Sequence, residues 1–140
     1  MSKTTVDTLN SESNTMMIRL ESYPEIFTLS NAHMENYSPG LITMQAAMPD
    51  KSYSMWLRFD SSIKEGDIHF SQVDKFWFEA KQNNGSNDVY SLVQSDDFRI
   101  NVKSIDKVKR NCQLDFQVRL QSGSSAPTLY ATGKVSIQGE

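Results

Sequence analysis

Residues 111–120 read NCQLDFQVRL and alternate apolar with polar side chains at a period of two. That period is typical of an antiparallel strand with one face buried and the other in water. The apolar face carries Cys112, Leu114, Phe116, Val118 and Leu120. Strand patterns also occur at residues 15–21, 25–30, 41–48, 53–60, 67–70, 74–80, 88–93, 98–105 and 129–138. The sequence therefore predicts an all-β protein.

The connections between these stretches are short and rich in turn formers. Asn83-Asn84-Gly85-Ser86 is a hairpin signal, because Asn and Gly tolerate the positive φ of tight turns. The even spacing favours a single antiparallel β-sandwich or flattened β-barrel of about 8–10 strands. Only residues 31–37 and 61–65 are candidates for a helical turn. Residues 1–14 are polar and are expected to form a flexible tail, which leaves residues 15–140 as one domain.

Charge and composition narrow the classes of partner. The net charge of −3 argues against a nucleic-acid binder, which needs a broad basic face. Cations gather locally in an eight-residue segment at one turn, which contains a single acid, Asp106: Lys103, Lys107, Lys109 and Arg110. Such a turn is most often simply solvated, and the alternative is a basic contact for an acidic partner.

The single cysteine and the lack of hydrophobic segments favour a cytoplasmic protein. One cysteine rules out an internal disulfide, and no apolar run is long enough for a transmembrane helix or a signal peptide. Removal of an earlier leader stays open. We expect no membrane partner.

The catalytic candidates are isolated from one another. His33 and Glu35 have the spacing of a zinc deaminase motif, but that motif also needs a cysteine pair, which this chain lacks. His69 is distant in sequence, and Cys112 faces the expected core. The adjacent Asp96 and Asp97 fit a turn. We therefore expect a protein that is not an enzyme, with no catalytic residues, no metal site and no cofactor.

Both tryptophans fall on faces that the alternation assigns to solvent. Trp56 shares its face with Arg58, and Trp77 shares its face with Lys75. If the two strands are neighbours, these four residues form one patch with the composition of a binding hot spot. The alternative is that another segment covers both indole rings.

Two functions remain open on these observations. The first is a non-catalytic protein-binding module, such as a small inhibitor or immunity-type protein, that uses Trp56, Arg58, Lys75 and Trp77. The second is a binder of a small ligand or carbohydrate. It would hold its ligand on the indole rings or inside a barrel lined by Met44, Met48, Phe76 and Phe78. Unpaired edges of an open sandwich would also allow a homodimer.

Overall fold

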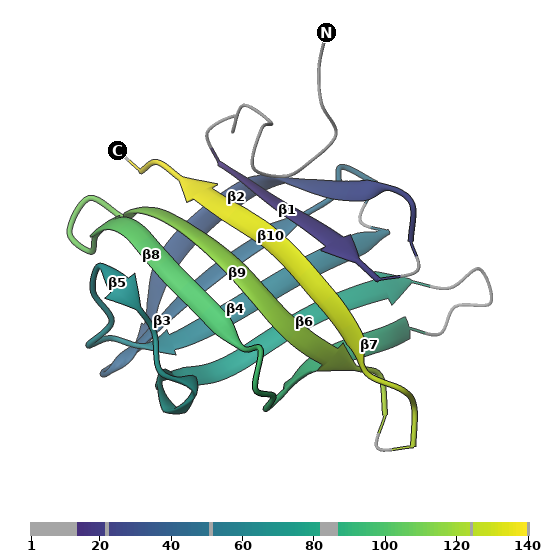
Figure 1. The fold of residues 1–140 in the computed structure, drawn as a ribbon. Coiled ribbons are helices and arrows are strands. Elements are labelled where there is room, and N and C mark those ends of the chain that lie inside the picture. The colour runs from purple at the N-terminus through teal and green to yellow at the C-terminus, as the bar shows by residue number, and fades with distance from the viewer. Residues whose placement is uncertain (1–13, 22, 51, 82–86, 124, 140) are drawn as a thin grey trace, which may run out of the picture.

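The computed structural model describes residues 14–21, 23–50, 52–81, 87–123 and 125–139, and strands dominate this part of the chain (Figure 1). One short 3-10 helix, η2 (Phe70–Gln72), accompanies them. The ten strands are β1 (Thr15–Leu20), β2 (Ile26–Ser38), β3 (Leu41–Ala47), β4 (Tyr53–Asp60), β5 (Gly66–Asp67), β6 (Val73–Lys81), β7 (Asn87–Val93), β8 (Arg99–Asp106), β9 (Asn111–Gln121) and β10 (Leu129–Ile137). The all-β prediction is confirmed.

The sheet closes on itself. Its strand order is β10-β1-β2-β3-β4-β6-β7-β9-β8-β5, and β9 also pairs with β10. The path from β10 to β9 therefore forms a closed antiparallel barrel of eight strands, with β8 and β5 added at its side. Of the two predicted architectures, the structure is the barrel.

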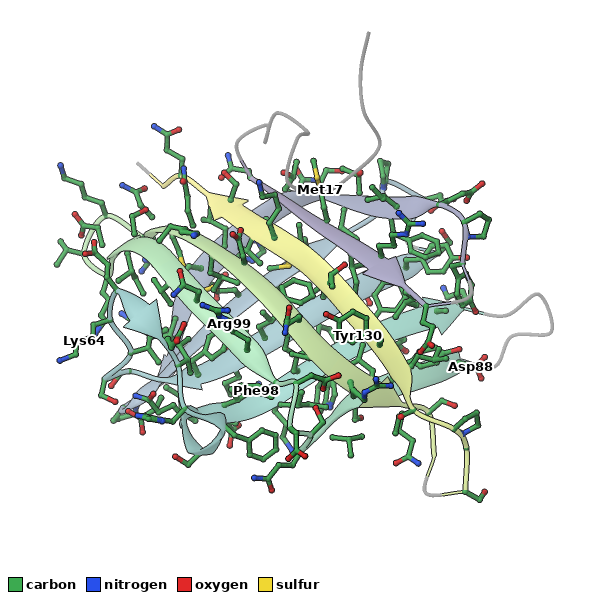
Figure 2. All side chains as sticks on the ribbon, in the orientation of Figure 1. Met17, Lys64, Asp88, Phe98, Arg99 and Tyr130 are labelled. Atoms are coloured by element: carbon green, nitrogen blue, oxygen red, sulfur yellow. The ribbon has the colours of Figure 1, made fainter. Side chains whose placement is uncertain are left out.

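The long strand β9 is where the barrel closes. One edge of β9 pairs with β10 along most of its length. The other edge pairs first with β8 and then, over its last three residues, with β7. In Figure 1, β8, β9 and β10 form the front wall, and β3, β4 and β6 lie behind them. Arg99 of β8 and Tyr130 of β10 are labelled on the front wall (Figure 2).

Aromatic rings meet across the barrel interior. The rings of Phe76 on β6 and Phe116 on β9 have centroids 5.1 Å apart, although these strands are not neighbours. The ring centroids of Phe27 on β2 and Phe78 on β6 likewise lie 5.5 Å apart. Such contacts are the expected filling of a small barrel, whose interior is just wide enough for side chains. The inward faces match the predicted alternation: Met16, Ile18, Leu20, Met44, Met55, Leu57, Phe59, Leu114, Val118 and Leu120 are all buried.

Three local predictions need correction. Residues 31–37 belong to β2 and do not form a helical turn. A β-bulge between Ser30 and His33 breaks the register with β3, and Asn31 there has a φ of 57°. Residues 61–65 also contain no helix, and the strand expected at 67–70 is only the two-residue β5 followed by η2.

Two sequence predictions fall wholly or mostly on residues that the structure does not describe. The Asn-Gly hairpin signal at 83–86 and most of the expected tail, residues 1–13, lie outside the described residues. Asn14 is described, and it is tied to the barrel. Its carbonyl accepts a hydrogen bond from the Ala32 N–H at 2.9 Å, and its side-chain Oδ1 accepts one from the Gln138 N–H at 2.9 Å.

Candidate functional site

The two tryptophans lie side by side on the outer surface of the barrel. Strands β4 and β6 pair directly, with Trp56 opposite Trp77. Their rings meet edge to face, with centroids 5.5 Å apart and an interplanar angle of 61°. Trp56 is 36% exposed, and Trp77 is partly buried. The condition stated from the sequence, that the two strands be neighbours, is met.

A row of side chains crosses five strands at the level of the two tryptophans. Cross-strand pairing places His33, Gln45, Trp56, Trp77 and Ser91 in one line on β2, β3, β4, β6 and β7. We call these five residues the tryptophan row. Because opposite side chains in a sheet are neighbours, the row is a continuous line of side chains across the outer surface.

Hydrogen bonds orient the polar end of the tryptophan row. The His33 Nδ1 lies 2.9 Å from the Asn31 carbonyl, so this nitrogen carries the proton that it donates. The Nε2 of neutral His33 then accepts from the Gln45 amide nitrogen, also at 2.9 Å. The Glu35 carboxylate is 3.2 Å from the same Nε2. When His33 is protonated, that carboxylate becomes its ion-pair partner.

Two cations flank the tryptophan row on one side. Arg58 and Lys75 are directly opposite each other on β4 and β6. The Arg58 Nε donates to Thr43 Oγ1 at 3.2 Å, and its guanidinium lies 3.6 Å from the Asp74 carboxylate. The Lys75 ammonium is 5.5 Å from the centroid of the Trp77 ring, within cation–π range. The four residues predicted as a patch therefore form one.

Small side chains flank the tryptophan row on its other side. Ser30, Ala47 and Ser54 pair across β2, β3 and β4, and Glu79 continues this line on β6. Because Ser30, Ala47 and Ser54 have short side chains, a groove of about 360 Å³ opens beside Trp56. Its lining residues also include His33, Met48 and Pro49. The combination of an indole wall, an aliphatic floor and a few hydroxyl and amide groups is typical of a binding depression.

The basic residues of β8 and of the β8–β9 turn have separate neighbours. Lys103 is 3.7 Å from Asp115, and the Lys107 ammonium donates to the Ser61 carbonyl at 2.5 Å. The Lys109 backbone N–H donates to Asp106 Oδ1 at 3.0 Å. Arg110 has a φ of 61° and lines a second depression, of about 440 Å³, together with Asn14 and Gly139.

The remaining titratable candidates lie in surroundings that favour a structural role over a catalytic one. Cys112 is buried, and burial raises the pKa of its thiol to about 12, so it is a poor nucleophile. The Ser95 hydroxyl donates to Asp97 Oδ1 at 2.6 Å and lowers the pKa of that carboxyl, with the Arg119 guanidinium as a further cause. Among the residues that the structure describes, no three His, Cys, Asp or Glu side chains group as a metal site.

Sequence reasoning missed an aromatic cluster at one end of the barrel. Tyr23, Phe27, Tyr53, Phe78 and Tyr90 contact one another there, and Tyr53 stacks on Phe78 at 5.7 Å. Burial raises the pKa of Tyr90 to about 12, and a hydrogen bond with Tyr23 adds to the shift. The inward phase of positions 27, 53 and 78 was readable, but their common height in the barrel depends on long-range register.

Comparisons with protein-family models, curated proteins and solved structures return no match for this chain. Within the described ranges, no helix has the length and apolar character needed to cross a membrane.

Proposed function

We propose that this protein is a non-catalytic protein-binding module of the inhibitor or immunity type, acting in the cytoplasm. Its binding surface would be the Trp56–Trp77 pair with the flanking Arg58 and Lys75. The observation that carries the proposal is the edge-to-face indole pair on the outside of a closed barrel. The barrel already has a separate aromatic interior, so these two rings are not needed to fill it.

The composition and rigidity of this surface support the proposal. Trp and Arg are the residue types most enriched among hot spots, where a few residues supply most of the binding energy. Arg58 is held by Thr43 and Asp74, and Trp77 is held between Trp56 and Lys75. Side chains that are already ordered lose less entropy when a partner binds.

Affinity capture with paired variants tests the proposal. The test variant is Trp56→Ala/Trp77→Ala. The matched control is Phe70→Ala/Phe98→Ala, which removes another edge-to-face pair of partly buried rings, 5.3 Å apart, at a different place on the barrel. Wild type and control should retain the same protein from a lysate of the source cells. The tryptophan variant should lose it while its melting temperature falls by only a few degrees.

Two results would contradict the proposal. The first is equal capture by the tryptophan variant and wild type. The second is loss of the folded state in the tryptophan variant alone, which would make the two indoles part of the structural core. A captured protein is then purified and bound to the folded variants, so that direct contact is separated from co-purification.

The groove beside Trp56 favours one alternative function, a small neutral saccharide or apolar ligand. Its hydroxyl and amide groups suit a sugar that stacks one face on the indole ring. The interior alternative is less favoured, because Met44, Phe76 and Phe78 are buried in packed contacts. A shift of tryptophan fluorescence on titration with glycans or lipids would support a ligand. A flat response across both panels would count against it.

A further inference from the structure

The tryptophan row divides the outer surface into two dissimilar sides. On β6 the outward side chains run Lys75, Trp77, Glu79, and on β4 they run Ser54, Trp56, Arg58. A cation therefore lies on one side of Trp77 and a carboxylate on the other. A long side chain lies on one side of Trp56 and a short one on the other. A surface of this kind can complement a copy of itself.

We propose that a second copy of this chain docks face to face on the tryptophan row, with a two-fold axis along the row. This inference rests on the proposed function and names a partner for the same surface. The rotation would bring Lys75 of each copy opposite Glu79 of the other. Arg58 would lie opposite Ser54 of the second copy while it keeps its own contacts with Thr43 and Asp74. Self-complementary contact of this kind is what an isologous dimer requires.

Charge selects this axis over the other simple choice. A two-fold axis parallel to the strands, between β4 and β6, would place Arg58 of one copy opposite Lys75 of the other. Like charges in direct opposition are unfavourable. The chosen axis avoids that opposition and instead forms the contact between Lys75 and Glu79.

The size of the surface sets the expected strength of the dimer. Five neighbouring strands at about 4.8 Å spacing and three levels of outward side chains cover roughly 500 Å² per copy. The total is near the low end of specific interfaces, and the outward curvature of a barrel reduces it further. We therefore expect a reversible dimer that dissociates on dilution. A second copy would cover both indoles until another protein competes for them.

Sedimentation velocity over a wide concentration range tests the inference with the protein alone. Wild type should show a monomer–dimer equilibrium. Lys75→Glu and Glu79→Lys should each shift the dimer dissociation constant upward by at least tenfold, because each variant places like charges together. An equimolar mixture of the two variants should regain the dimer, since each heterodimer contact again joins opposite charges. Thermal melts of each variant confirm that the monomers are folded.

Three results would overturn the inference. The first is a wild-type chain that stays monomeric at every concentration. The second is a dimer whose dissociation constant is indifferent to both charge reversals. The third is a dimer that Lys75→Glu strengthens. The last result would indicate the axis parallel to the strands. Failure of the dimer leaves the proposed function intact if the tryptophan variant still loses its captured protein. Failure of that capture test is a separate result, so the two proposals are distinguishable.

Discussion

Replacing Gly133 by alanine is expected to force β1 away from β10. An added Cβ would lie 2.0 Å from the Met17 carbonyl oxygen and 2.4 Å from the Phe116 ring. Ordinary contact begins at 3.4 Å, so the carbonyl would have to retreat by about 1.4 Å, the difference between these two distances. Because the nearest atom belongs to the backbone, no change of rotamer relieves the clash.

The size of the loss in unfolding free energy follows from the contacts that the displacement of β1 disturbs. Gly133 pairs with Ile18 in the β1–β10 ladder. Overpacking a core costs about 1–3 kcal/mol, and two weakened ladder hydrogen bonds add about 1 kcal/mol each. We therefore expect Gly133→Ala to lower the free energy of unfolding by about 3–5 kcal/mol. Urea titration followed by far-ultraviolet circular dichroism measures this loss.

Two other glycines supply matched controls. Gly123 has open space around its Cβ position and no positive φ, so Gly123→Ala should change the free energy of unfolding by less than about 1 kcal/mol. Gly40 has a φ of 89°, so Gly40→Ala should cost about 1–2 kcal/mol through backbone strain alone. A loss below about 1 kcal/mol for Gly133→Ala would refute the packing argument. Full rescue by adding Phe116→Leu would show that the ring clash alone matters.

Three further predictions concern the tryptophans and the cysteine. The edge-to-face contact of Trp56 and Trp77 should give an exciton couplet in the far-ultraviolet circular dichroism spectrum. Trp56→Phe and Trp77→Phe should each abolish it, and a couplet that survives either change would place the rings apart. Cys112 should react with a thiol reagent only after unfolding, and rapid labelling of the native protein would contradict its burial. Its pKa is raised from 9.0 to about 12 on folding, so its contribution to stability is complete below pH 9 and decreases as the pH rises toward 12.

Much of the fold was predictable because alternation is a local signal. In β4, residues 53–60 were assigned the correct bounds and the correct inward phase. The failure at residues 31–37 has a physical cause in the bulge of β2. The extra residue there places Leu29 and Ala32 both inward at a spacing of three, which resembles a helical period. The position of β8 beside the barrel was not readable, because its alternation is the same as that of a barrel strand.

The candidate site was likewise predictable only in part. The outward phase of Trp56 and Trp77 followed from the sequence, because neighbouring positions carry core residues. Their contact did not follow, since β5 and η2 intervene between β4 and β6 along the chain. The groove beside Trp56 depends on the registers of β2, β3 and β4, which set Ser30, Ala47 and Ser54 in one line. Registers between strands are set by the whole barrel, so local patterns cannot supply them.

The affinity of a purified partner for wild type and for Trp56→Ala/Trp77→Ala is the most direct test of the central claim. Truncating a hot-spot residue costs about 2 kcal/mol or more, so the tryptophan variant should bind at least about 30-fold more weakly. Phe70→Ala/Phe98→Ala should bind within about threefold of wild type, an energy difference below about 0.7 kcal/mol. Equal affinities for all three folded proteins would show that the Trp56–Trp77 surface does not bind the partner.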